Sequence, residues 1–207
     1  MTGRTAFALL LSVFFVLPAL RPASAQEVVG TVDSAQGATD AVRADVPTPL
    51  AAGSDVLLDD TLRTGEGARL AATLADKTAI QLGENAEMTI DSFVYAGKDK
   101  GKGGAVLEAV QGAFLVVGGA VEKRKAGLKV KTPVATISLR GTTVWGGRID
   151  DAYGVFVAEG LVTVTTQRGR VTLRPGEGTS ISDDLRPEKP RRWPQEKVDR
   201  ALRSVRP

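Results

Sequence analysis

Apolar and polar residues alternate in short runs from about residue 28 to residue 181. In residues 69–74, "RLAATL", Leu70, Ala72 and Leu74 share one face, and residues 78–82, "TAIQL", repeat this pattern. Successive side chains of a strand point to opposite faces, so such a run predicts a β-strand with one buried face. Similar runs follow at residues 87–90, 105–110, 113–117, 154–160, 161–166 and 170–174. The sequence therefore predicts an all-β body.

Turn signals separate these runs at short intervals. Glycine together with polar residues or proline, which is typical of turns, occurs at residues 64–68, 82–86, 166–170 and 174–178. Two stretches, "QGAFLVVGG" at residues 111–119 and "EGLVTVTTQRG" at residues 159–169, also share an order of glycine, alternating valines and glycine. Short strands in weakly similar units favour a β-solenoid-like or elongated double-sheet body, with a β-sandwich as the alternative.

The tail, residues 182–207, has a different pattern. It begins as a linker rich in proline and charge. From Gln195 onward, helical spacing relates the apolar residues Val198, Ala201, Leu202 and Val205. Pro194 suits the first position of such a helix. We expect a short C-terminal helix, either docked through Trp193 or left as part of a mobile tail.

The N-terminus has the pattern of a secretory signal peptide. Arg4 precedes the apolar run "AFALLLSVFFVL", and "ASA" at residues 23–25 provides small residues for a cleavage site. The apolar run is shorter than the roughly 20 residues of a membrane-spanning helix. We therefore predict a signal peptide over 1–25, cleaved between Ala25 and Gln26, an all-β domain over 26–181, and the tail over 182–207. The mature protein would be periplasmic or secreted, without a transmembrane anchor.

Composition excludes several classes of chemistry. The chain has no cysteine and no histidine, which excludes disulfides, Cys–His and Ser–His–Asp catalytic sites and the usual zinc sites. Signal cleavage would remove Arg4 and Arg21 but no acidic residue, so the mature chain is nearly neutral, unlike a nucleic-acid-binding protein. We expect no enzyme activity, no cofactor and no metal site.

Three pairs of neighbouring aspartates are the remaining candidates for chemistry. Neighbours in a strand point to opposite faces, so we interpret them as solvated turns. The pairs are Asp59-Asp60, Asp150-Asp151 and Asp183-Asp184. The glycine- and lysine-rich residues 97–104, "GKDKGKGG", are interpreted as a basic surface loop, because no helix follows to form a phosphate site.

Residues 130–147, "VKTPVATISLRGTTVWGG", interrupt a strand-like run with proline, arginine and glycine. The apolar residues occupy even positions before Pro133 and odd positions after it, which predicts a strand start, an edge or a bulge there. Gly141 leaves room for a bend. Arg140 falls on the polar face with Thr142, where its guanidinium could bind carbonyls or a carboxylate and hold the bend, or could contact a partner.

These segments resemble the FecR family, the periplasmic domain of iron-citrate-type transmembrane regulators, which also occurs in stand-alone exported proteins. The similar segments are residues 61–90, 130–147 and 154–181. The resemblance implies a β-solenoid-like body and contacts with other envelope proteins. It also gives the middle segment a structural role and a possible role in interaction, through the motif residues Thr132, Pro133, Arg140, Gly141, Thr142, Trp145 and Gly146.

The predicted signal peptide occupies the place of the cytoplasmic segment and membrane helix of family regulators, so we do not transfer sigma-factor control to this chain. We expect an exported binding or scaffold protein of the bacterial envelope that acts through protein–protein contacts, including contacts in signalling. Two alternatives stay open. One is a glycan- or peptidoglycan-associated module, and the other is a ligand-sensing regulator of a separate membrane partner.

Overall fold

The computed structural model of the protein describes residues 26–43, 45–95 and 103–207. The predicted signal peptide, including Ala25, lies outside the described residues, and Gln26 is the first of them. Most of the predicted basic loop at 97–104 also lies outside them.

Strands make up most of the described chain. In chain order they are β1 (Val28–Gln36), β2 (Thr39–Arg43), β3 (Val46–Pro49), β4 (Asp55–Leu57), β5 (Thr61–Thr64), β6 (Arg69–Leu74), β7 (Ala79–Leu82), β8 (Glu87–Val94), β9 (Gly104–Gln111), β10 (Phe114–Val117), β11 (Gly127–Lys131), β12 (Thr136–Ile149), β13 (Ala152–Thr166), β14 (Gly169–Leu173), β15 (Glu177–Ile181) and β16 (Arg191–Arg192). A 3₁₀ helix at Ala120–Lys123 and the α-helix α1 at Gln195–Arg203 complete the fold. The prediction of an all-β body with a short C-terminal helix is confirmed.

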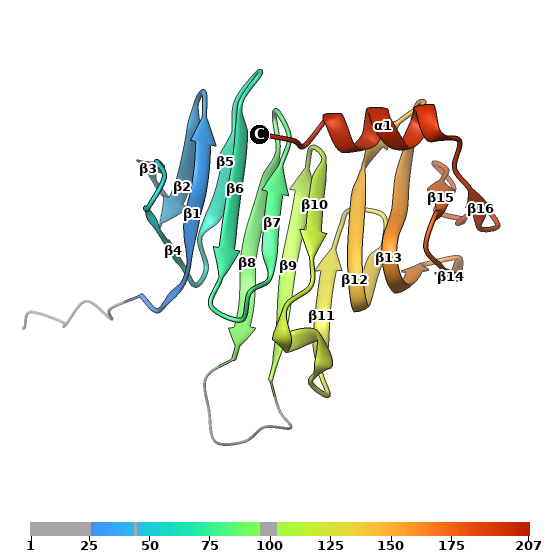
Figure 1. Cartoon of the computed structure of the whole chain (residues 1–207), viewed down its shortest axis with the longest axis horizontal. Coiled ribbons are helices and arrows are strands. Elements are labelled where there is room, and N and C mark those ends of the chain that lie inside the picture. Colours follow the sequence, from blue (N-terminus) through green and yellow to red (C-terminus); the bar gives the residue numbers. More distant parts are fainter. Residues whose placement is uncertain (1–25, 44, 96–102) are drawn as a thin grey trace, which may run out of the picture.

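All the strands belong to one curled sheet with two arms (Figure 1). The first arm runs in the order β3-β2-β5-β8-β9-β11, and the second runs in the order β10-β7-β6-β1-β4. The two arms meet at β12, which pairs with β11 through its first half and with β10 through its second half. One edge of β13 pairs with β12 along its length. The other edge pairs with β15 through residues 153–156, beside the second arm, and with β14 through residues 162–166, beside the first arm. Neighbouring strands are antiparallel, except for the parallel pair β9 and β11.

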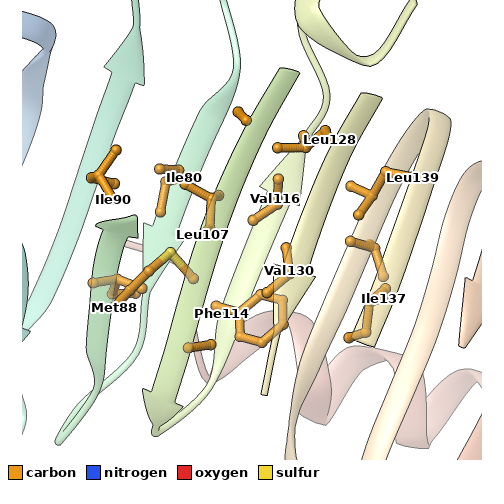
Figure 2. Packing of buried hydrophobic residues seen from close by; sticks show 14 of the residues in the cluster. Ile80, Met88, Ile90, Leu107, Phe114, Val116, Leu128, Val130, Ile137 and Leu139 are labelled. Atoms are coloured by element: carbon orange, nitrogen blue, oxygen red, sulfur yellow. The ribbon is translucent and has the colours of Figure 1, made fainter. Parts of the chain in front are cut away.

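The main core lies between the arms. Ile80 of β7 and Val116 of β10 lie close to Leu107 of β9 and Val130 of β11, all of them fully buried (Figure 2). Burying one such side chain contributes about 1.5–3 kcal/mol to folding. The alternation in the sequence therefore places one face of most strands in this core, which stabilises a chain that has no disulfide.

Helix α1 packs against side chains of β10, β12 and β13 that face away from the main core. The ring of Trp193 stacks on Phe156 with centroids 5.3 Å apart and meets Trp145 edge-on at 6.0 Å. The Trp145 Nε1–H donates a hydrogen bond to Ser204 Oγ at 3.2 Å. The C-terminal helix is therefore docked, with Trp193 as its anchor. Across the described ranges, no helix is long and apolar enough to cross a membrane.

The start of the helix differs slightly from the prediction. Pro194 has an extended ψ of 146° and lies just before the helix, which begins at Gln195. The carbonyl of Pro194 accepts hydrogen bonds from the backbone N–H groups of Lys197 and Val198. Pro194 is thus the N-cap residue and not the first helical residue, because its own backbone is not yet helical.

The interpretation of Asp60 as part of a solvated turn is wrong. Its side chain is fully buried, and its carboxylate accepts hydrogen bonds from Arg43 Nε at 2.9 Å and from the backbone N–H of Leu57 at 2.8 Å. A cation and a backbone donor compensate the desolvation of this carboxylate. Asp150 does lie in an exposed turn, but it also forms ion pairs with Lys197 and Arg200 of α1 at 2.9 Å and 2.8 Å.

Candidate functional site

The Arg140–Thr142 segment forms the bend where β12 passes from the first arm to the second. The register between β12 and β13 shifts between Arg140 and Thr143, which marks a β-bulge. Gly141 has a φ of +63°, in the left-handed region that glycine adopts without strain. The bend expected at Gly141 is present, and it is the corner at which the sheet curls.

A second glycine makes this corner possible. Gly160 of β13 lies opposite the bend with a φ of +80°, and a Cβ at position 160 would overlap the carbonyl oxygen of Gly141. The two backbones approach each other so closely that no side chain fits between them. The role of Gly160 was not predictable from the sequence, since its partner Gly141 lies nineteen residues earlier in the chain.

Arg140 does not hold the bend. Its side chain is exposed, and among the described residues no hydrogen bond or ion pair is found for its guanidinium. Thr142, which we expected on the same face, is buried because the bulge turns it inward. The backbone N–H of Gly118 donates to the carbonyl of Thr142 at 2.8 Å, and the carboxylate of Glu122 accepts a long hydrogen bond of 3.4 Å from the Thr142 N–H. These hydrogen bonds of Thr142 with Gly118 and Glu122 hold the bend, and Arg140 takes no part in them.

Arg140 instead lines a recess on the outer face of the first arm, with a volume of about 290 Å³. Lys125, Lys129, the half-exposed Leu161 and the buried Glu122 also line it. Burial raises the pKa of the Glu122 carboxyl, while hydrogen bonds from Thr142 oppose this rise. The recess therefore combines exposed cations with one buried carboxylate and an apolar side chain, a composition that suits an interface with another protein.

Thr132 and Pro133 lie in the turn of the β11–β12 hairpin. The backbone N–H of Thr132 donates to the carbonyl of Ala135 at 2.8 Å, and Thr132 Oγ1 accepts a hydrogen bond from the Ala135 N–H at 3.0 Å. The change of phase at Pro133 results from this reversal of the chain and not from a bulge. Pro133 suits the turn because it has no N–H to donate to a ladder.

An apolar groove of about 320 Å³ opens beside this turn. Val134, Tyr153, Ile181 and Leu185 line it, and Arg148 lies at its rim. Burial raises the pKa of the Tyr153 hydroxyl, although a hydrogen bond with Thr132 opposes the rise. Asp183 of the third aspartate pair also borders this groove, which the sequence could not predict because its walls come from distant segments.

Trp145 and Gly146, the last motif residues, serve packing. Trp145 is buried beneath α1. A Cβ at position 146 would lie 2.5 Å from the ring of Phe114, so only glycine lets this ring pack against β12. Of the seven motif residues, six therefore lie in the turn, the bend or the packed interior, and Arg140 points outward.

The 3₁₀ helix beside the bend depends on a further carboxylate that the sequence analysis missed. Asp76 is buried and accepts hydrogen bonds from the N–H and Oγ1 of Thr78, each at 2.9 Å, and from the Val121 N–H at 2.8 Å. It thereby holds the segment that carries Glu122. An Asp–Lys–Thr turn in the sequence is the signal that could have indicated this role.

Comparison with known proteins gives a family and a fold. The FecR protein family model matches residues 60–163, half of the chain. No curated protein matches this chain. Two crystal structures of a candidate anti-sigma factor from Parabacteroides distasonis ATCC 8503 share the fold, each with a TM-score of 0.54 and 17% identity over 69% of this chain. The matched region spans 63% and 64% of those two chains, slightly less than two thirds of their length. The chain belongs to the FecR family.

Proposed function

We propose that this protein is an exported regulatory binding protein, which acts in signalling through contact between the outer face of its first arm and another protein of the bacterial envelope. Membership in the FecR family and the fold shared with a candidate anti-sigma factor support a regulatory role. The signal-peptide pattern of residues 1–25 supports export.

The exposure of Arg140 is the observation that carries the proposal. Two glycines, Gly141 and Gly160, allow the tight bend beside Arg140. The Arg140 side chain is nevertheless exposed, and its guanidinium has no hydrogen bond or ion pair in the described chain. A rigid backbone that presents an arginine next to an exposed leucine, here Leu161, loses little entropy on binding. An arginine guanidinium can also bind a carboxylate through two parallel hydrogen bonds, which favours a partner that presents acidic groups.

In-cell crosslinking tests the proposal. A photo-crosslinking phenylalanine analogue at position 161 leaves Arg140 in place and should capture a specific envelope protein in the native bacterium. The same analogue at Val46, which is exposed at the far end of the first arm, is the matched control and should not capture it. The yield at 161 should fall in Arg140→Ala. Capture of a cell-wall polymer, equal capture at both positions, or no dependence on Arg140 would refute the proposal.

Export has its own test. The mature protein should be recovered outside the cytoplasm with Gln26 as its first residue. Mass spectrometry that finds residues 1–25 on the stable protein would show that they are not a cleaved signal.

A further inference from the structure

Four strands end the curled sheet, and three of them are poor templates for pairing with another chain. β3 and β4 are the free edges at one end of the molecule, and β14 and β16 are the free edges at the other (Figure 1). β4 has three residues and β16 has two. The five-residue β14 and the four-residue β3 are the longer edges. A free edge carries unpaired backbone groups, and proteins usually blunt it.

β3 is blunted by prolines. In an antiparallel pair, facing residues alternate between exchanging both hydrogen bonds and exchanging none. The N–H of Leu50 donates to the carbonyl of Thr39, so by alternation the next bonding pairs are Ala41 with Thr48 and Arg43 with Val46. The residues that turn their backbone groups to the free edge are therefore Pro47 and Pro49. Neither proline has an N–H, so this edge offers no donor at either position.

β14 has the same geometry without the prolines. The two-residue turn between Thr166 and Gly169 makes them a bonding pair with β13, and Val171 and Leu173 bond to β13 in the same way. Arg170 and Thr172 therefore direct their N–H and C=O groups to the free edge, and both residues are exposed. β14 pairs with β13 alone, so these groups are open to a further strand.

The charge around β14 selects the kind of strand that can pair there. Residues 161–174 contain three arginines, Arg168, Arg170 and Arg174, and no acidic residue. Asp184, from the segment after β15, lies near Arg168 and lowers the local positive charge there, whereas Arg170 and Arg174 form no ion pair among the described residues. Pairing with β14 of a second copy would bring arginines against arginines, and like charges on facing strands are destabilising. An acidic strand would instead place carboxylates beside these guanidinium groups.

The edge is continuous with the surface of the proposed function. Arg140 pairs with Leu161 across the β12–β13 ladder, and the next residues of β13 pair with β14. Strands of a sheet lie about 4.8 Å apart and residues of a strand about 3.3 Å apart. Thr172 lies two strands from Arg140 and opposite Thr163, two residues beyond Leu161, so Arg140 and Thr172 are separated by roughly 12 Å. One partner can therefore contact both.

We propose that an extended, acidic segment of the partner protein adds to the free edge of β14 as a further strand. This inference rests on the proposed function and specifies how the partner binds. Backbone hydrogen bonds at Arg170 and Thr172 supply the attachment, and the three arginines select acidic side chains.

Variants at the edge test this inference in the full-length protein, with capture from position 161 as the readout. Thr172→Pro removes the outward N–H without removing a bond to β13, and should lower the capture of the partner about tenfold or more, as the loss of about 1.4 kcal/mol in binding implies. Thr172→Val keeps the N–H and should capture as the parent does. Arg170→Glu should also lower capture at least about fivefold, independently of any effect of proline on the fold.

The outcomes separate the two proposals. If position 161 captures no protein in the parent, the proposed function fails and this inference fails with it. If it captures a protein equally well in Arg170→Glu and in a folded Thr172→Pro, the proposed function stands and strand addition is wrong. Mass spectrometry of the adduct should map the contact to an acidic segment, and an adduct with a second copy of this chain would overturn the assignment of the partner.

Discussion

The carbonyl of Gly141 fills the space into which a side chain at position 160 would extend. The two glycines lie on facing strands, each with a positive φ, at the corner where β12 and β13 carry the sheet from one arm to the other. The corner therefore depends on the missing side chain at 160 and on the backbone freedom at 141.

Alanine substitutions at the two glycines should differ in cost. Gly160→Ala requires both a strained φ and a displacement of the facing backbone, so we expect it to lower the free energy of unfolding by about 2–4 kcal/mol. Gly141→Ala has the strained φ, but apart from its two chain neighbours no residue lies within 4 Å of the added Cβ, so about 1–2 kcal/mol is expected. Urea denaturation measures both. Equal costs would show that the close approach is not a constraint.

Arg140→Ala should leave stability almost unchanged, within about 0.5 kcal/mol, because the side chain is exposed and the fold makes no use of its charge. Urea midpoints of the parent and the variant provide the measurement. A loss of more than about 1 kcal/mol would mean that the guanidinium supports the bend after all.

Two arginines of the first arm offer a comparison between a buried and an exposed ion pair. Arg43→Met leaves the fully buried Asp60 without its cation, and should cost about 2–3 kcal/mol, less than a completely buried pair because Arg43 is partly exposed. Arg63→Met breaks a pair with Asp40 in which both side chains are partly exposed to solvent, and should cost less than about 1 kcal/mol. Similar thermal shifts in the two variants would contradict this ranking.

The alternation of apolar and polar residues was sufficient to predict where along the chain the strands occur, because the alternation is a property of neighbouring residues. Ile80 and Leu82 are buried as their period predicts. The path of the sheet was not predictable in this way. The change of phase at Pro133 is produced equally by a bulge or by a hairpin, and only the pairing of β11 with β12 decides between them.

The roles within the candidate site were harder to predict, because each depends on which residues come near. The sequence places Arg140 on a polar face but cannot tell whether a carboxylate reaches it. The carboxylate that does contact the bend belongs to Glu122, in a 3₁₀ helix without a sequence signal that we recognised. Helical spacing predicted α1, whereas its docking depends on Phe156, far from Trp193 in the sequence.

Glu122 should give the stability of the protein a dependence on pH. Burial raises the pKa of its carboxyl above the ordinary value of 4.5, so the folded state binds its proton more readily than the unfolded state. The stability of the parent relative to Glu122→Gln should therefore increase as the pH falls from neutrality through the folded pKa, down to about 4.5. Urea denaturation over this range provides the test, with the exposed Glu108→Gln as a control. A difference that is constant with pH would contradict the assignment.

Trp193 should decide whether α1 stays on the sheet. Its indole packs against both the ring of Phe156 and the facing Gly178, where a side chain at 178 would overlap it. Lys197 Nζ lies 4.4 Å from the ring centroid. Trp193→Ala removes the aromatic contacts of the tail with Phe156 and Trp145, so we expect a loss of about 3 kcal/mol in the free energy of unfolding. We also expect proteases to cleave the tail before the body unfolds.

A matched control separates this effect from a general sensitivity of the tail. Arg203→Ala changes an exposed residue of the same helix and should leave both stability and proteolysis as in the parent. Trp193→Phe keeps an aromatic ring against Phe156 and should restore part of the protection. Limited proteolysis followed by mass spectrometry, together with urea denaturation, gives both readouts. If Trp193→Ala retains a tail as resistant as that of Arg203→Ala, the ion pairs of Asp150 and the buried Ala201 and Val205 would be sufficient to hold the helix, and Trp193 would not be its anchor.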